Sequence, residues 1–514
     1  MAFFRRRPKA VSAAERQDNG TDMTRIGRQA RGAPRGGRAA LCAGTAGLRA
    51  GLAGLALAAL AACGGPGPGA GSGAGSGAAA TATRAAAPAA FAAGALSFPP
   101  ERGAPPRRSN AQMQADFMAL VFRMESGREV PVLTRFEGPV TVRLSGRVPP
   151  FAERDLDRLL ARLRAEAGID ITRSDRPGAA ITVEFVPRRA LQAYAPTAAC
   201  FVTPGVSSWR DYRGARRSGA TDWTALTVRT RAAVFIPDDT GPQEVRDCLH
   251  EELAQGLGPL NDLYELPDSV FNDDNINGVL TGFDMLILRA IYAPELRSGM
   301  GPDAVAQRLP ALFARLNPGG GSGPPEWRSP TPRAFAAALD GAISPRASGT
   351  ERRGAALRAT AIADSAGWTD ARAGFAWFLR GRLDFGSRPE PALRALERAD
   401  AIYAASPLTS GAHRAHVAMH LAAFALTQGQ AAAAEAIAAA AMPAAAESRN
   451  AALLASLMMV RAEALRLQDR PAEAEAQRRE AVAWARYGIG DEAAIRRRLG
   501  DIGALSPLGH GGAR

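Results

Sequence analysis

The sequence predicts an α+β domain followed by an all-helical domain, and three observations support this. Between residues 108 and 300, segments with the apolar period of a helix are mixed with short apolar runs typical of strands. Helices and strands do not alternate strictly in that region, which favours an α+β arrangement. After residue 350 no strand pattern appears, and helical segments follow one another in pairs.

The first 63 residues have the pattern of an export signal. Residues 25–49 carry six arginines, and Gly51–Ala62 is a run of twelve uncharged residues that ends directly before Cys63. A basic region, a short apolar core and small residues at the cleavage point define a secretory signal. With a cysteine in the first mature position, the segment resembles the bacterial lipobox, in which that thiol is lipidated. The alternatives are an ordinary cleaved signal and an anchor helix, although twelve residues cannot span a bilayer core of ~30 Å.

Lipidation of Cys63 would anchor the protein to a membrane on the periplasmic face of the cell envelope, because two acyl chains anchor stably. Gly64, where the usual sorting rule has Asp for the inner membrane, favours the outer membrane. Residues 64–107 are rich in Gly, Ala and Pro and predict a flexible tether.

The basic charge of the chain is concentrated in the leader. Residues 1–63 hold eleven Lys and Arg and three Asp and Glu, which gives +8 of the total +13 and leaves +5 for residues 64–514. The charges of the mature part alternate in sign along the predicted helices, as on a solvated surface. We therefore expect no nucleic-acid partner.

The elements of the domain at residues 108–300 are predicted from apolar periodicity and from Gly and Pro positions. We expect helices at 111–124, 152–166, 244–257 and 280–292, and strands at 140–144, 181–186 and 232–236. Residues 301–350 should contain a helix and a second linker, because residues 317–350 are rich in Pro and Gly.

Two cysteines remain in the mature part after Cys63. In an oxidising compartment, Cys200 and Cys248 are expected to form a disulfide. Such a bond would add ~3–4 kcal/mol in the chain-entropy model. The alternative is two buried free thiols.

The predicted helix at 244–257 carries a degenerate metalloprotease pattern. His250 and Glu251 open an H-E-x-x-H motif, but Ala254 stands in the place of its second histidine. In a frame shifted by one residue, the extended zincin spacing would place Glu251, Gln255 and Asn261 at the ligand positions and Glu252 at that of the general base. A carboxylate and two amides bind Zn²⁺ poorly. An active zinc hydrolase, a zincin-like scaffold without metal and a plain core helix all remain open.

A second motif has the spacing of a calcium loop. Asp273, Asn275, Asn277 and Asp284 occupy positions one, three, five and twelve, with Gly278 at position six. The last ligand would be Asp rather than Glu, and Pro267 stands where an entering helix should run. The alternative is a turn rich in Asx caps before a helix, which needs no ion. Zinc and calcium are the two cofactors that the motifs would use.

The C-terminal part resembles a tetratricopeptide-type array of helical repeats over residues 351–497, followed by a tail at 498–514. Breaks near Gly386, Gly429 and Asp469 lie 43 and 40 residues apart. Such arrays offer concave surfaces for protein partners. His413, His416 and His420 share one helix face at i, i+3 and i+7 and could bind a metal, although a packed or solvated face is the alternative.

Several motifs occur in order along residues 108–300. These are Arg135–Val140, Ala199–Val202, Cys248–Glu252, Gln255–Asp262, Asp268–Asp273 and Tyr292–Met300. Together they resemble a family of Gram-negative envelope lipoproteins described as domain of unknown function 2927, for which no reaction is established. The resemblance implies an envelope lipoprotein and no activity.

The sequence favours an interaction or assembly scaffold at the cell envelope, in which the zincin-like domain is a pseudo-enzyme. The alternative is an envelope metallohydrolase or peptidase with Glu252 as general base. A calcium-stabilised module is a third interpretation. Whether the protein is an enzyme is therefore left open by the residues themselves.

Overall fold

A computed structural model describes residues 98, 103–196, 198–324, 329–344 and 346–507, all within one compact unit. The predicted leader, the lipidation of Cys63 and most of the tether lie outside these residues. In the part of the chain that the structure describes, no helix combines the length and the apolar content needed to cross a bilayer.

A five-stranded sheet with the order β2-β1-β3-β5-β4 forms the centre of the first domain. Four strands run parallel, and β4 pairs antiparallel with β5 at one edge. The central strands β3 and β5 are buried on both faces, so they are nearly continuous apolar runs. The strands are β1 (Val140–Gly146), β2 (Ile171–Arg173), β3 (Ile181–Val186), β4 (Phe201–Pro204) and β5 (Ala232–Pro237).

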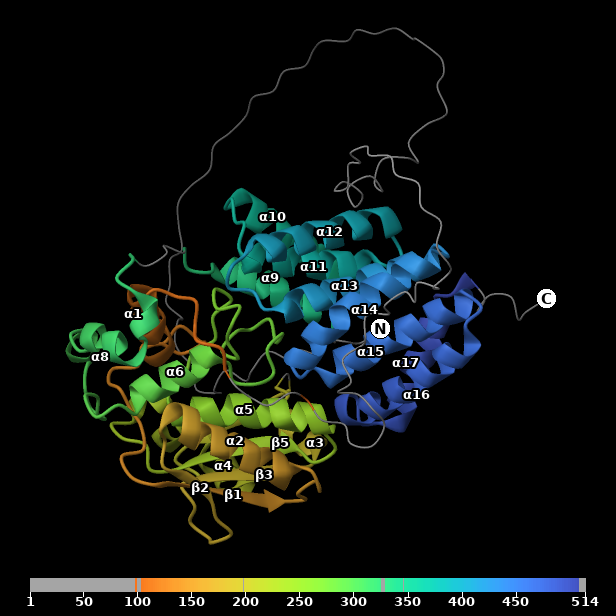
Figure 1. Ribbon diagram of the computed structural model, residues 1–514. Coiled ribbons are helices and arrows are strands. Elements are labelled where there is room, and N and C mark those ends of the chain that lie inside the picture. The colour runs from red at the N-terminus through yellow and green to blue at the C-terminus, as the bar shows by residue number, and fades with distance from the viewer. Residues whose placement is uncertain (1–97, 99–102, 197, 325–328, 345, 508–514) are drawn as a thin grey trace, which may run out of the picture. The chain divides into compact units, whose positions relative to one another are not determined.

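Helices cover both faces of this sheet. On one face α2 (Ala152–Ala167) and α5 (Pro242–Leu257) lie side by side, as Figure 1 shows. The other face carries α3 (Arg188–Gln192) and α4 (Trp209–Ala215), which bury an aromatic cluster of Phe201, Trp209 and Phe235. The predicted mixed architecture is confirmed, and the mainly parallel sheet follows from the α2 crossover between β1 and β2.

The apolar face of the amphipathic helix α2 is buried, as its sequence predicts. Leu156, Leu159, Leu160 and Leu163 are all at most 1% exposed and belong to the main core. The helix ends at Gly168, whose φ of 70° is in the left-handed region that favours glycine at a C-terminus.

Four further helices complete the first domain: α1 (Asn110–Val121), α6 (Gly282–Ile291), α7 (Pro302–Ala306) and α8 (Leu309–Leu316). Residues 103–107, which composition assigned to the tether, pack against this group. A Cβ on Gly103 would lie 2.6 Å from the Gly282 Cα, so the two backbones touch. Arg108 then forms ion pairs with Asp116 and Asp268. The ordered domain therefore begins before residue 108.

Among the described residues after α8, the regular elements are helices, as predicted. Its helices are α9 (Arg333–Ile343), α10 (Gly349–Ser365), α11 (Ala371–Asp384), α12 (Pro389–Ala405), α13 (Gly411–Thr427), α14 (Ala431–Glu447), α15 (Ala451–Leu467), α16 (Pro471–Gly488) and α17 (Glu492–Gly503). One prediction needs correction, because α9 lies inside the predicted linker at 317–350. Phe335 and Leu339 of α9 are fully buried against the array, and this packing outweighs the local Pro and Gly content.

The three predicted repeat pairs are α11–α12, α13–α14 and α15–α16, which pack as neighbours in Figure 1. Two of the predicted breaks are turns with positive φ, at Gly429 (70°) and Asp469 (55°). These left-handed residues end one helix and start the next. Alanine dominates the contacts between α14 and its neighbours, because its small side chain allows close packing.

The array and the first domain meet through specific polar contacts. Gln243 of α5 donates to the Asn450 Oδ1 at 3.1 Å and accepts from the Ala452 amide at 3.0 Å. Tyr487 of α16 donates to the Asp155 Oδ2 of α2 at 3.1 Å. These contacts place α5 between the sheet and the helical array.

Candidate functional site

Helix α5 positions the residues of the degenerate zincin motif. It begins with Gly241 as N-cap and Pro242 in its first turn, and it ends at Gly258. Val245, Leu249 and Leu253 are fully buried at a spacing of four residues and fix one face against the sheet. This packing fixes the rotation of α5 about its axis, and with it the directions of the other side chains of the helix.

His250, Glu251 and Glu252 leave the helix in three different directions, since successive residues are about 100° apart. His250 is 2% exposed, and its Nδ1 accepts a hydrogen bond from the Leu280 amide at 3.1 Å. Glu252 is 1% exposed, whereas Glu251 is half-buried and lines a cleft. The opening pair of the motif is thus split between the protein interior and the cleft.

Burial lowers the pKa of His250 well below 6.5, and three nearby guanidinium groups lower it further. They belong to Arg162, Arg246 and Arg449. A positive surrounding of this kind disfavours the binding of a dication at the His250 ring. Zinc ligation by this histidine would have to overcome that repulsion.

Gln255 and Asn261 have protein partners for their amides. The Gln255 Nε2 donates to the Asp262 Oδ2 at 3.1 Å. The Asn261 Nδ2 donates to the Ala119 carbonyl at 2.9 Å, and its Oδ1 accepts from the Asp262 amide at 3.1 Å. Among the described residues, no group of three or more His, Cys, Asp or Glu could hold a metal ion. The zinc hypothesis remains a prediction, and these contacts favour the scaffold interpretation.

Asp284 of the calcium-like motif caps helix α6. Its carboxylate accepts from the Ser269 hydroxyl at 2.5 Å, the Val270 amide at 3.1 Å and the Thr281 amide at 2.7 Å. The Asp284 amide donates in turn to the Thr281 Oγ1 at 3.3 Å, which completes a capping box. Burial raises the pKa of Asp284 to about 6. The Asp284 carboxylate therefore stabilises the N-terminus of α6.

Asn272 and Asp274 of the same loop form Asx turns. The Asn272 side chain accepts from the Asp274 amide, and the Asp274 side chain accepts from the Ile276 amide, both at 2.9 Å. Asn277 donates to the Pro267 carbonyl at 2.7 Å, and Asn275 has a φ of 54°. Asp273 is 9% exposed. These contacts match the capped turn that needs no ion, while calcium binding itself stays a prediction.

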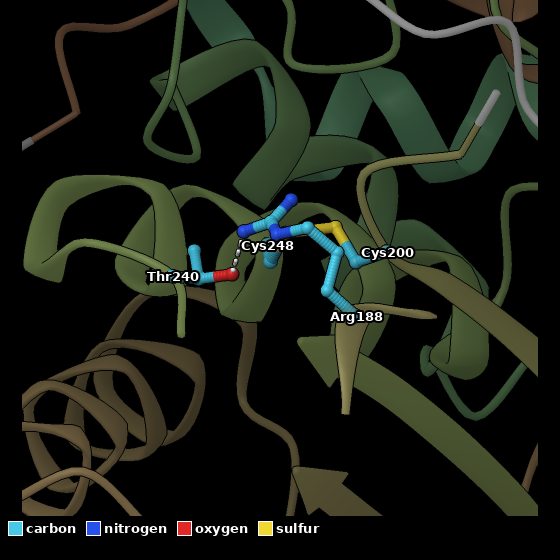
Figure 2. The surroundings of a disulfide bond; sticks show 4 residues. All are labelled: Arg188, Cys200, Thr240 and Cys248. Carbon is cyan, nitrogen blue, oxygen red and sulfur yellow. Dashed lines mark hydrogen bonds between the residues drawn. A yellow bond between two sulfur atoms is a disulfide. The ribbon is translucent and has the colours of Figure 1, made fainter. Parts of the chain in front are cut away.

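The predicted disulfide between Cys200 and Cys248 is confirmed. It joins the residue before the edge strand β4 to the middle of α5, and both cysteines are 4% exposed. Figure 2 shows its surroundings, where the Arg188 Nη2 donates to the Thr240 Oγ1 at 3.0 Å. The bond fixes α5 to the edge of the sheet.

The three histidines of α13 are packed inside the protein and have different neighbours. The His413 Nε2 lies 3.5 Å from the Asp274 Oδ2, and the His416 Nε2 lies 3.4 Å from the Asn450 Nδ2. The His420 ring lies between Phe378 and Phe385, at 5.5 and 6.1 Å between ring centroids. Burial lowers the pKa of His416 to about 3 and that of His420 well below 6.5. This is the packed face that the sequence left as an alternative.

A cleft of about 540 Å³ lies between α5 and the helical array. From the first domain it is lined by one face of α5, the Cys200–Cys248 disulfide and residues 275–278. From the array it is lined by His416 and by parts of α15, α16 and α17. Sequence reasoning missed this cleft, because its two walls come from parts of the chain that are far apart, with His416 lying 138 residues after Gly278.

Charged side chains line the α5 wall of the cleft. Asp247 accepts two hydrogen bonds from Arg246, at 3.0 and 2.6 Å. Burial raises the pKa of Asp247 to about 6. A Cβ on Gly278 would lie 2.6 Å from this carboxylate, so the loop backbone passes directly over it. Glu244 and Glu251 lie on the same wall.

A buried arginine that the sequence did not single out stabilises the end of α5. Arg229 is 3% exposed, donates to the Gln255 and Gly258 carbonyls at 2.6 Å each, and donates to the Thr134 hydroxyl at 3.1 Å. Its guanidinium lies 4.6 Å from the centre of the Trp223 ring. A cation at a helix C-terminus neutralises the partial negative charge there. Burial lowers the pKa of Arg229 to about 10.

Residues 110–311 match a family model described as protein of unknown function DUF2927. This confirms the resemblance inferred from the motifs of residues 108–300. No curated protein and no solved structure matches the chain. The matched range ends before α9, so it includes α5 and the loop at 275–278 but none of the helical array.

Proposed function

We propose that this chain is a lipid-anchored protein of the cell envelope that acts as an interaction or assembly scaffold. One observation carries the proposal: the helical array and the first domain are joined through α5 into a single body, with a cleft between them. Paired helices present extended surfaces to protein partners. The lipobox-like segment before Cys63 supports the anchor, and the Gly-rich segment after it supports a tether.

The contacts of α5 favour the scaffold over the metallohydrolase alternative. The amides of Gln255 and Asn261 are used by Asp262 and Ala119, and His250 faces the Leu280 amide. A zinc centre would need these side chains to turn toward a common point. Glu252 as general base has no assembled ligand set beside it among the described residues.

The anchor is tested by metabolic labelling with radioactive palmitate in the native host. We expect the wild-type protein to carry label and to sediment with membranes. Cys63→Ala should carry no label and should appear in the soluble fraction. Label retained by Cys63→Ala, or a wild-type protein without label, would exclude lipidation at this residue.

The scaffold role is tested by photo-crosslinking in intact cells. A photoreactive residue is placed at Glu390 of α12, which is 86% exposed, or at Arg479 of α16, which is 68% exposed. A matched control carries it at Glu153 of α2, which is 58% exposed. We expect discrete adducts from the two array positions and none from Glu153. Equal adducts from all three positions, or none from the array, would contradict the proposal.

A further inference from the structure

The exposed face of α4 is rich in arginine. The segment Trp209–Arg217 holds four arginines and one carboxylate, Asp211, so its net charge is +3. Arg210 and Arg213 are three residues apart and are neighbours on one face of the helix, and Arg217 follows in the turn after its C-terminus. All three are exposed, and we call them the α4 arginine face.

The guanidinium groups of the α4 arginine face are not used inside the protein. Among the residues that the structure describes, none of these three side chains forms an ion pair or a hydrogen bond. On the helical array, exposed arginines lie beside carboxylates of the same helix, such as Arg394 at 3.8 Å from Glu390 and Arg479 at 3.5 Å from Glu475. The positive charge of the α4 arginine face is therefore available to an external anion.

Two carboxylates belong to the same region, and both act at the start of α4. The Glu184 Oε2 of β3 accepts from the Trp209 amide at 2.6 Å. Asp211 lies in the first turn of α4, where a negative charge stabilises the N-terminus of a helix. Arg143 of β1 lies close enough to Glu184 to interact with its charge. Five arginines therefore stand against two carboxylates, and the region stays positive.

Aromatic packing holds α4 rigidly on the sheet. The Trp209 and Phe235 rings lie 5.0 Å apart between centroids, and the Arg216 guanidinium lies 4.8 Å from the centre of the Tyr194 ring. This packing directs the α4 arginine face away from the sheet. Because α4 covers the sheet face opposite to α5, a flat anionic surface can contact α4 while α5 keeps its contacts with the helical array.

We propose that the α4 arginine face docks on the anionic phospholipid headgroups of the membrane that carries the lipid anchor. A Gly-rich chain of ~40 residues, such as the predicted tether, spans ~35 Å, so the anchor keeps the first domain close to headgroup phosphates. Arginine forms strong charge-assisted hydrogen bonds with phosphate. The inference rests on the proposed anchor and goes beyond the scaffold role, because it fixes which side of the protein faces the membrane.

Fluorescence quenching in vesicles tests which side faces the lipid. Gly214 of α4 and Gly500 of α17 are both exposed, and a Cβ at either position meets nothing within 4 Å, so Gly214→Cys and Gly500→Cys can each carry a fluorophore. Cys200 and Cys248 are bonded to each other and do not react with the label.

The lipidated protein is placed in vesicles that contain a headgroup nitroxide, with ~30% phosphatidylglycerol or with phosphatidylcholine alone. We expect quenching at Gly214 in the anionic vesicles only, its loss at ~0.5 M salt, and no quenching at Gly500. A Gly214 label that is not quenched in anionic vesicles, or is quenched no more than the Gly500 label, overturns the proposal.

Sedimentation with anionic vesicles tests the arginines without the anchor, on the mature chain from residue 64, at ~20 mM salt so that screening stays weak. Arg210→Gln, Arg213→Gln and Arg217→Gln together should lower the partition coefficient ~100-fold, because each arginine near an anionic surface changes it about fivefold. At physiological salt this contact alone is too weak to hold the chain on a membrane, since stable anchoring needs acyl chains.

A matched triple variant comes from the helical array, where Arg394, Arg479 and Arg486 are 68%, 68% and 62% exposed. Replacing these three with Gln removes the same charge and should leave vesicle binding as in the wild type, and circular dichroism checks that each variant is folded. Equal losses in both triple variants would contradict docking through α4. Failure of palmitate labelling with vesicle binding intact would reject the anchor alone, whereas a labelled protein without quenching at Gly214 would reject this docking face alone.

Discussion

Acidification should destabilise this protein through its buried histidines. His250, His416 and His420 are at most 4% exposed, and burial keeps all three neutral in the folded state. In the unfolded chain each imidazole titrates near its ordinary pKa of about 6.5. Below that pH the unfolded state binds more protons than the folded state, so the free energy of unfolding falls as the pH falls.

The magnitude follows from the width of this pH window. Between pH 7 and pH 5 each of the three histidines should remove ~2 kcal/mol from the free energy of unfolding, which amounts to ~6 kcal/mol together. Buried carboxylates act in the opposite direction. Burial raises the pKa of Asp155, Glu184 and Glu480, and it raises the pKa of Asp247 and of Asp284 to about 6. Asp247 and Asp284 bind protons in the folded state and should return ~1.3 kcal/mol each over the same window. We expect a net loss of at most ~3 kcal/mol.

The assay is urea unfolding followed by far-ultraviolet circular dichroism, at pH 7, 6 and 5. His416→Gln serves as the matched variant, because glutamine is neutral throughout and can keep the contact with Asn450. The variant should lose ~2 kcal/mol less than the wild type between pH 7 and pH 5. A comparison at pH 8, where the imidazole is neutral in both states, separates the loss of packing from the effect of protonation.

A stability that is constant or rises on acidification from pH 7 to pH 5 would refute this reasoning. So would a pH dependence that His416→Gln leaves unchanged. Either result would mean that the imidazoles reach solvent or find anionic partners in the folded protein.

Three further predictions concern the framework around α5. Arg229→Ala should lower the free energy of unfolding by ~3–5 kcal/mol in urea titrations, because the carbonyls it binds stay buried without a donor; a loss below ~1 kcal/mol would show that they reach water. Replacing Cys200 and Cys248 with Ser should cost ~4 kcal/mol by the same measurement, and reducing agent should then have no further effect on the variant. Phe98→Ala should lower stability by ~1–2 kcal/mol and change the fluorescence of Trp484, whose ring centroid lies 4.8 Å away; an unchanged spectrum would place Phe98 outside this contact.

Most elements of the fold could be predicted from the sequence, because each shows a local pattern of apolar residues or of turn residues. The strand at 181–186 matches the structure at both ends, and Gly429 and Asp469 mark real turns between helices. β2 and β4 were missed because strands of three and four residues are too short to show a period. Helix α9 was missed because the sequence around it is rich in Pro and Gly, which indicates a linker. The helix is stabilised instead by the burial of Phe335 in the tertiary structure.

The candidate site could be predicted only in part. The disulfide followed from cysteine count and compartment, and the capped turn at Asp284 was stated as an alternative to calcium. The side chains of His250 and Glu251 could not be oriented from a motif, because the direction of each depends on how α5 rotates against the sheet. The cleft and the role of Arg229 depend on residues distant in the chain, so no local pattern contains them.

The division of the cleft between two domains has an evolutionary consequence. The matched family range ends at residue 311 and includes the α5 wall of the cleft, whereas the opposite wall belongs to the helical array. A protein with the first domain alone would expose the α5 wall to solvent and would lack the opposite wall. Joining a different helical array to the same domain would replace one wall of the cleft and leave the other unchanged. The shape and charge of the cleft would therefore change by recombination of domains, without any substitution in α5.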